Sequence, residues 1–193
     1  GAGVYVSSAS TATIDRCIFR NNNTYNNSGS DGSCLYNNGT TTIQNTLIYD
    51  NTCANTSSNG HLYNITGTLN IYNCTITENI GAVGGDIYAS TGNVTDTNCI
   101  VYNNGGTDSF YEGTATCSFT YSLFDAGTFG TITKNNNDEV SAPSFTNAAG
   151  DDFTIGSGSA CENTGTGTSM PSYDLVEATR PYGGSHDIGA YEY

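Results

Sequence analysis

Charge is scarce in this sequence and almost all of one sign. Only 11% of the 193 residues are charged, with eighteen Asp and Glu against four Lys and Arg, and the formal net charge is −14. No nucleic-acid partner is expected, because contacts to phosphates need clustered Lys and Arg side chains. The same charge would repel an anionic polysaccharide. It also leaves few cations for a polysaccharide lyase, which must neutralise a uronate.

Long apolar runs, Trp and Pro are missing or rare as well. No stretch approaches twenty apolar residues, so no transmembrane segment is expected. The chain opens on Gly-Ala-Gly and shows no charged n-region of a signal peptide. Asn, Thr, Gly, Ser and Tyr fill the composition, and Asn, Thr and Gly are poor helix formers. Strands and turns are therefore favoured over helices.

A motif recurs at intervals of 29, 28, 25 and 23 residues, counted from Cys17. Each copy has a small residue and, two positions later, a large apolar one; four copies add an Asn three positions further on. The small residues are Cys17, Thr46, Cys74, Cys99 and Ser122. The apolar residues are Phe19, Ile48, Ile76, Val101 and Phe124. The Asn residues are Asn22, Asn51, Asn79 and Asn104.

The repeat predicts a parallel β-solenoid. Apolar residues alternate with period two inside each segment, which is typical of strands. Because each segment is too short to bury a face alone, equivalent residues of successive units must stack, about 4.8 Å apart. The Asn column then forms a structural ladder at the corners, where amides bond to one another and to turn backbone. We expect an all-β domain with about five coils over residues 1–125, and a loop with a C-terminal capping section over 126–193.

Two stretches resemble a known family. The unit Gly-x-Tyr…Ile-x-x-Cys-x-Phe-x-x-Asn looks like the coils of right-handed parallel β-helix repeat proteins. The tail Arg180-Pro-Tyr-Gly-Gly-Ser-His-Asp-Ile-Gly-Ala-Tyr-Glu-Tyr193 resembles the terminal section of bacterial secreted or surface members. The resemblance implies a right-handed β-helix, a tail that closes the last coil, and a secreted or cell-surface location. It does not fix a function, since members include adhesins and polysaccharide-active enzymes.

The best catalytic candidates are Asp50 and Glu78. They follow equivalent strands of neighbouring coils, so they should lie about 5 Å apart at the backbone. Two carboxylates at that separation suit a retaining glycosidase. Solvated turn carboxylates are the simpler interpretation, which we favour. Tyr49 directly precedes Asp50, and Tyr102 occupies the equivalent position of another unit. Both are candidates for stacking on sugar rings.

Seven cysteines leave at least one unpaired in any disulfide scheme. Cys17, Cys74 and Cys99 belong to the small column and are expected in the core. The better disulfide candidates are Cys34, Cys53, Cys117 and Cys161, whose pairing the sequence leaves open. His61 and His186 stand alone in the sequence, away from any Cys-x-x-Cys spacing, so no metal–thiolate site is expected.

Two further features concern the surface. Asp and Glu in loops are suitable oxygen donors for calcium, although no loop has the spacing of a known calcium motif. Asn-x-Ser/Thr sites make Asn26 and Asn55 the glycosylation candidates, because both fall in expected loops.

Three functions remain open at this point. The favoured one is a non-enzymatic, secreted or cell-surface structural protein, either adhesin-like or stacking end to end into a filament through the first coil as a homo-polymer. A truncated sequence explains the open first coil equally well. The alternatives are a carbohydrate-active enzyme (glycoside hydrolase or lyase) using Asp50 and Glu78, and a glycan-binding module using Tyr49 and Tyr102. No cofactor other than calcium is suggested.

Overall fold

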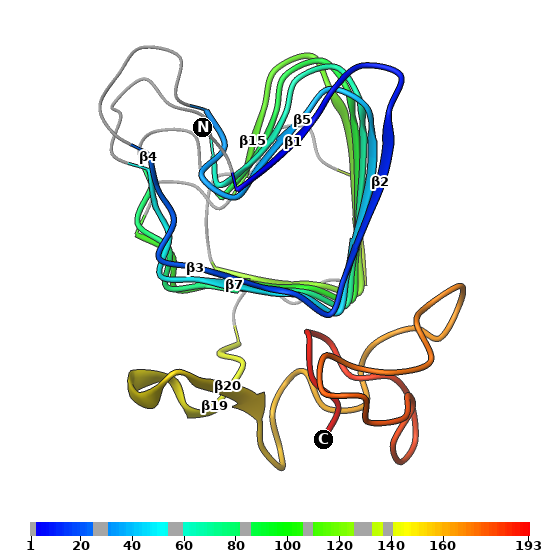
Figure 1. The fold of residues 1–193 in the computed structure, drawn as a ribbon. Helices are drawn as coiled ribbons and strands as arrows, with labels where there is room; N and C mark the ends of the chain where they lie inside the picture. The colour runs from blue at the N-terminus through cyan, green and yellow to red at the C-terminus, as the bar shows by residue number, and fades with distance from the viewer. Residues whose placement is uncertain are drawn as a thin grey trace.

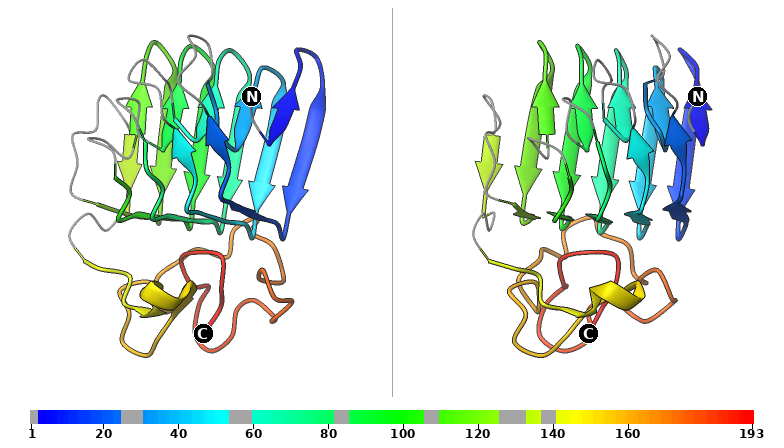
Figure 2. Two further views of the ribbon diagram at one scale, coloured as in Figure 1. Left: turned by 60° about the vertical axis from the view of Figure 1, so that its left-hand side comes forward. Right: turned by 90° about the vertical axis from the view of Figure 1, so that its left-hand side faces the viewer.

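The structure is a computed structural model that describes residues 3–24, 31–53, 60–81, 86–105, 110–125, 133–136 and 141–193. Asn26 and Asn55, the glycosylation candidates, lie outside these described residues. Three parallel sheets, A, B and C, form the sides of a solenoid (Figure 1 and Figure 2). The described residues contain no helix long and apolar enough to cross a membrane.

Each sheet takes one strand from each successive coil. Sheet A contains β1 (Val4–Val6), β5 (Leu35–Asn37), β9 (Leu62–Asn64), β12 (Ile87–Ala89) and β15 (Phe110–Glu112). Sheet B contains β2 (Thr11–Asp15), β6 (Thr40–Gln44), β10 (Thr68–Tyr72), β13 (Asn93–Thr97), β16 (Thr116–Thr120) and β18 (Thr133–Asn135). Sheet C contains β3 (Ile18–Arg20), β7 (Leu47–Tyr49), β11 (Thr75–Thr77), β14 (Ile100–Tyr102) and β17 (Leu123–Phe124). A short additional pair is β4 (Asn23–Thr24) with β8 (Thr52–Cys53).

The chain runs clockwise from β1 through β2 to β3 as it recedes from the viewer of Figure 1, so the solenoid is right-handed. The all-β parallel β-helix predicted from the repeat is therefore confirmed. Equivalent residues pair in register between coils, as for Phe19, Ile48 and Ile76. Their side chains, with those of Val101 and Phe124, point into the solenoid and form part of its core.

Left-handed backbone turns separate sheet B from sheet C. One such residue follows each of five strands of sheet B, with φ between 48° and 56°. They are Arg16, Asn45, Asn73, Asn98 and Tyr121. Asn suits this conformation because its short side chain can hydrogen-bond locally. A second left-handed column follows sheet C and contains Asn21, Asp50, Glu78 and Asn103.

The C-terminal section, residues 141–193, covers a side of the solenoid. It contains β19 (Phe145–Asn147), the 3₁₀ turn η1 (Ala148–Gly150) and β20 (Asp152–Ile155). It lies beneath sheet C in Figure 1 and Figure 2. The tail was expected to close the last coil. It lies along sheet C instead because the outward side chains of that sheet, such as Leu47, Ile100 and Leu123, are apolar and need a cover.

The tail motif is explained by this packing. Gly189 has a φ of 107°, and a Cβ there would lie 2.7 Å from Cδ1 of Ile100, so only glycine lets the backbone approach sheet C. Its neighbour Ala190 donates its N–H to Oγ1 of Thr75 at 3.0 Å. Arg180 forms an ion pair with Glu192 at 2.6 Å, and both side chains are fully buried. The motif thus combines a close backbone approach with an internal charged pair.

Candidate functional site

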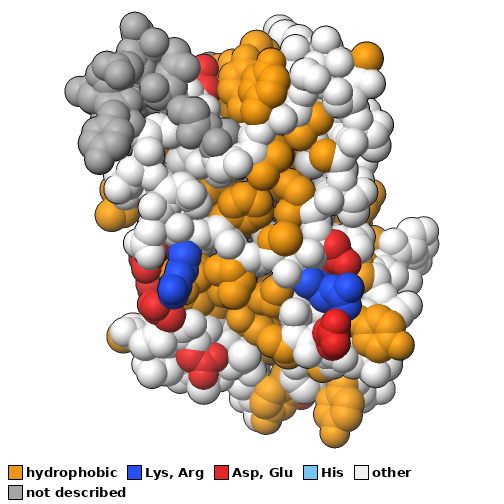
Figure 3. Space-filling model, viewed as in Figure 1, with side chains coloured by type: hydrophobic (Ala, Val, Ile, Leu, Met, Phe, Trp, Pro, Cys, Tyr) orange, Lys and Arg blue, Asp and Glu red, His pale blue; other side chains and the backbone are white. Residues whose placement is uncertain are grey.

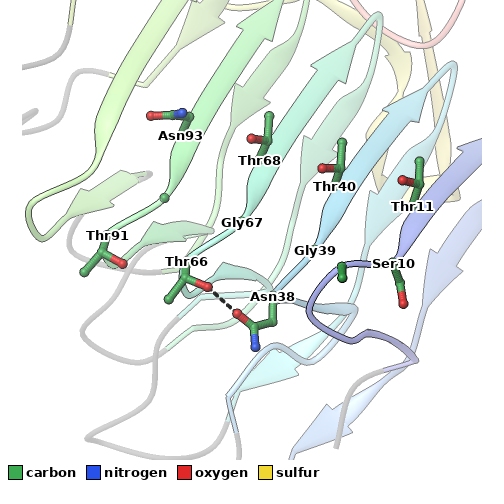
Figure 4. A pocket seen from close by; sticks show the side chains of 12 residues that line it. Ser10, Thr11, Asn38, Gly39, Thr40, Thr66, Gly67, Thr68, Thr91 and Asn93 are labelled. Carbon is green, nitrogen blue, oxygen red and sulfur yellow. Dashed lines mark hydrogen bonds between the residues drawn. The ribbon is translucent and has the colours of Figure 1, made fainter.

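A polar groove crosses four coils at the corner between sheets A and B (Figure 4). Its volume is about 350 Å³. In Figure 4 the side chains of Thr11, Thr40, Thr68 and Asn93 form one row, and Ser10, Asn38, Thr66 and Thr91 lie along the turns beside it. None of the twelve lining residues is charged, so the groove offers hydroxyl and amide groups only.

Glycines form the floor of this groove because the coils approach each other there. A Cβ on Gly67 would overlap the carbonyl oxygen of Gly39, and a Cβ on Gly92 would overlap that of Gly67. The backbone bonds Thr68 N–H to Gly39 O and Asn93 N–H to Gly67 O, both 2.9 Å long, hold the coils at this spacing. The groove is therefore a preformed feature of the stacked backbone.

The groove side chains differ in their hydrogen bonding within the protein and in their exposure. Thr66 donates a hydrogen bond to Oδ1 of Asn38, drawn as the dashed line in Figure 4, and Thr91 donates to the carbonyl oxygen of Ile65 at 2.9 Å. Thr40 is exposed and Thr68 is half-buried, and the two residues pair directly across strands β6 and β10. Their hydroxyls recur once per coil, about 4.8 Å apart.

Asp50 and Glu78 lie on neighbouring coils, as predicted. They follow Tyr49 and Thr77, which pair between β7 and β11, and both have a φ of 52°. The pKa of Glu78 is raised, first by burial and then by the charges of Asp50 and Asp151. Asp151 belongs to the C-terminal section, so a third carboxylate joins the two that the sequence suggested.

Tyr49 cannot serve as the predicted sugar platform. It is only 4% exposed, and its ring packs against Phe153 with centroids 5.0 Å apart. Its hydroxyl accepts a hydrogen bond from Arg20 at 2.9 Å. Tyr102 is half-buried and packs against a hydrophobic cluster that includes Ile188. The C-terminal section takes up the sheet C face on which both tyrosines were expected to be open to solvent.

The Asn ladder is confirmed. In each step, both the backbone N–H and the side-chain amide of one Asn donate to Oδ1 of the next, at 2.9 to 3.1 Å. The ladder runs through Asn22, Asn51, Asn79 and Asn104. Asn51 and Asn79 are fully buried, while Asn22 and Asn104 at its ends are half-buried. Its role is structural.

A buried polar column at the start of sheet A was missed by sequence reasoning. Ser33 Oγ lies 2.6 Å from Nδ1 of His61, and Nε2 of His61 lies 3.9 Å from Oδ1 of Asp86. Burial lowers the pKa of His61 to about 4 and raises the pKa of Asp86 well above its usual value. His61 was predicted to stand alone, but the fold stacks it between Cys34 and Asp86.

This column resembles a hydroxyl–imidazole–carboxylate relay in composition only. Ser33, His61 and Asp86 are at most 3% exposed, so a substrate has no access to them. A base with a pKa of about 4 would also be weak at neutral pH. We therefore assign the column a structural role.

The cysteines do not form disulfides. All seven are present as thiols, and all are buried except Cys17, which is half-buried. The four disulfide candidates, Cys34, Cys53, Cys117 and Cys161, are thus corrected to core thiols. Burial raises the pKa of Cys34 to about 12. Within the described residues, no group of three or more His, Cys, Asp or Glu side chains is arranged to hold a metal ion.

No protein-family model, curated protein or solved structure matches this chain.

Proposed function

We propose that this chain is a non-enzymatic, adhesin-like structural protein of the cell surface or extracellular space that holds an extended neutral glycan in the groove along Gly39, Gly67 and Gly92. The observation that carries the proposal is a charge-free groove, lined by hydroxyl and amide groups, that repeats once per coil. A glycan laid along the solenoid axis would meet equivalent groups on successive coils. Several weak contacts would then act together.

The charge of the protein supports a neutral ligand. At a formal net charge of −14, a polyanion would be repelled, whereas a neutral glycan has no such penalty. Hydrogen bonds to hydroxyls also leave binding nearly independent of salt. Secretion or surface display is part of the proposal, since it brings the groove to extracellular glycans.

Sedimentation with insoluble neutral polysaccharides (cellulose, chitin and xylan) tests the proposal. The double variant Thr40→Val/Thr68→Val removes two groove hydroxyls and keeps side-chain shape. We expect wild type to bind at least one polysaccharide at low and high salt, and the double variant to bind several-fold more weakly. Thr179→Val, an exposed position outside the groove, is the matched control. Failure of wild type to bind any of the three, or unchanged binding by the double variant, would overturn the proposal.

End-to-end assembly is a second structural role that we propose. β1, β2 and β3 are outer strands of their sheets in the described structure. These three strands belong to the first coil, in which Tyr5 is 66% exposed and Ile18 is 55% exposed. Figure 3 has the same viewpoint as Figure 1, with the first coil nearest the viewer, and shows hydrophobic side chains in the middle of that end of the solenoid. Negative-stain electron microscopy should show rods longer than one chain that shorten in Ile18→Glu; single short rods in the wild type would contradict assembly.

The glycosidase alternative is favoured by one observation, the raised pKa of Glu78 beside Asp50. A retaining enzyme needs an acid/base carboxyl of raised pKa next to a nucleophilic carboxylate. Asp50→Asn and Glu78→Gln should each abolish hydrolysis of any glycan that the wild type cleaves. Equal activity in the variants would remove this site.

A further inference from the structure

A second pocket lies between sheet B and the C-terminal section. It has a volume of about 440 Å³, within the range of small-ligand sites. Its solenoid wall comes from the ends of β10, β13 and β16, and its outer wall from residues 166–170. The lining residues are Tyr72, Thr95, Thr97, Thr120, Tyr121, Thr166, Thr168, Ser169 and Met170.

Tyr121 is the unusual residue of this pocket. It occupies the left-handed turn column with a φ of 53°, where three of the preceding coils place Asn. A bulky aromatic residue is disfavoured in this conformation, and such backbone strain is concentrated at binding sites. Asn73 and Asn98 use their amides to hold the C-terminal section, bonding Asp187 O at 3.2 Å and Thr166 O at 2.7 Å. Tyr121 instead contributes an aromatic side chain to the pocket lining.

The outer wall is held in place independently of any ligand. Oδ1 of Asn98 also accepts the N–H of Thr166 at 2.9 Å, so one side-chain amide binds both backbone polar groups of that residue. Gly165 donates its N–H to the carbonyl oxygen of His186 at 2.8 Å. The pocket is therefore preformed, and a ligand would not have to order the segment that closes it.

The chemistry of the lining selects an uncharged, amphipathic ligand. Two tyrosine rings and Met170 offer apolar surface, while six Thr and Ser residues offer hydroxyls. No Asp, Glu, Lys, Arg or His lines the pocket, so neither an anion nor a cation would find a charged partner. A pyranose ring has this combination, with C–H groups on its faces and hydroxyls at its edge.

We propose that this pocket binds one ring of a neutral sugar, with Tyr121 as the stacking residue. The inference rests on the proposed function for its ligand class, a neutral glycan, but the pocket and the groove share no residue. The two sites flank opposite ends of the sheet B strands.

The test uses soluble oligosaccharides of β-1,4-linked glucose, N-acetylglucosamine and xylose, with binding measured by calorimetry and by saturation-transfer NMR. Tyr121→Asn installs the residue that this turn column favours, so the variant should fold at least as well as wild type. We expect its affinity for the bound sugar to fall roughly tenfold, as for the loss of one stacking contact. Tyr182→Asn, at a side chain 69% exposed in the tail, should bind like wild type.

Unchanged affinity in Tyr121→Asn, or no binding of any of the three oligosaccharides by wild type, would overturn the inference. Its failure can be told apart from failure of the groove. If no polysaccharide sediments the protein while oligosaccharides bind in a Tyr121-dependent way, the groove proposal falls and the pocket stands. If Thr40→Val/Thr68→Val impairs sedimentation and Tyr121→Asn changes nothing, the reverse holds.

Discussion

The ring of Phe153 packs on the ring of Tyr49, with centroids 5.0 Å apart and an interplanar angle of 59°. Phe153 comes from β20 of the C-terminal section, and Tyr49 from the outward face of sheet C. Phe145 adds a second ring 5.3 Å from Phe153. This aromatic contact fastens the C-terminal section to the solenoid.

Phe153→Ala should therefore destabilise the protein by about 3–5 kcal/mol, as large-to-small changes at buried aromatic residues do. Phe153 is 1% exposed, so the cavity left behind could not fill with solvent without disrupting the contact. Urea unfolding followed by circular dichroism measures the change. Tyr182→Ala, at an exposed position, should stay within about 0.5 kcal/mol of wild type. Equal midpoints for wild type and Phe153→Ala would show that the section is not fastened here.

The Asn ladder allows a graded comparison between its middle and its end. Asn79 is fully buried, and its Nδ2 donates to both Asn104 Oδ1 and Ile48 O at 3.1 Å. Asn79→Ala removes the acceptor of the Asn51 N–H and a donor to the Ile48 carbonyl oxygen, and it should lower the free energy of unfolding by about 2–4 kcal/mol. Asn104→Ala, at the half-buried end, should cost less because water can replace the lost bonds. The same unfolding titration compares the two, and equal losses would contradict a cooperative buried ladder.

Gly67→Ala tests whether the close contact between coils requires glycine in the groove floor. The added methyl group would overlap the carbonyl oxygen of Gly39, so the two coils would have to separate. We expect a loss of at least about 2 kcal/mol. Gly156→Ala is the control, because no other atom lies within 4 Å of a Cβ placed there. Thermal unfolding of both variants provides the measurement, and a Gly67→Ala protein as stable as Gly156→Ala would mean that the coils are not in tight contact.

The repeat made the coils predictable because a solenoid stacks like residues on like. The Ile48 and Ile76 column and the Asn51 and Asn79 ladder therefore follow from alignment alone. Two members of the buried polar column, His61 and Asp86, would have been found by the same means. Extending the alignment one residue upstream of Leu35, Leu62 and Ile87 brings Cys34, His61 and Asp86 into register.

The place of the C-terminal section did not follow from the repeat. Strict alternation puts Tyr49 outward, which suggested a sugar platform. The available signal was the unbroken apolar run Leu47–Ile48–Tyr49, buried at all three positions, since strands covered on both faces lose their alternation. The pockets depend on how this section packs and on glycine contacts between coils, which no local pattern encodes.

The buried imidazole of His61 predicts a loss of stability in acid. Its pKa is about 4 in the folded protein, lowered by burial from the usual 6.5. The unfolded chain therefore takes up the proton first, so the stabilisation is complete above pH 6.5 and is lost between 6.5 and 4. The loss amounts to about 3 kcal/mol. Asp86, with its raised pKa, acts in the opposite direction, so the effect of His61 is the difference between wild type and His61→Gln. The measurement is the free energy of unfolding of both proteins between pH 4 and pH 7. Parallel profiles would contradict the prediction for His61.

Asp96 predicts the opposite pH dependence at a separate place in the core. It occupies the column of Ile43 and Ile71, is fully buried, and its Oδ1 accepts a hydrogen bond from Ser122 at 2.6 Å. Its second carboxylate oxygen has no hydrogen-bond partner. Burial raises the pKa of Asp96 from 3.8 to about 7. The folded protein therefore keeps this proton longer than the unfolded chain, and stability falls as the pH rises from 3.8 to about 7.

Asp96→Asn removes the titration and keeps an oxygen for Ser122. The variant should match wild type near pH 4 and be more stable by up to about 4 kcal/mol above pH 7. Urea unfolding at both pH values measures the difference. Asp151→Asn, at an exposed left-handed position that Asn tolerates, controls for the change in net charge. If Asp96→Asn gained the same stability over wild type at both pH values, the titration of Asp96 would not be the cause. A packing effect alone does not depend on pH.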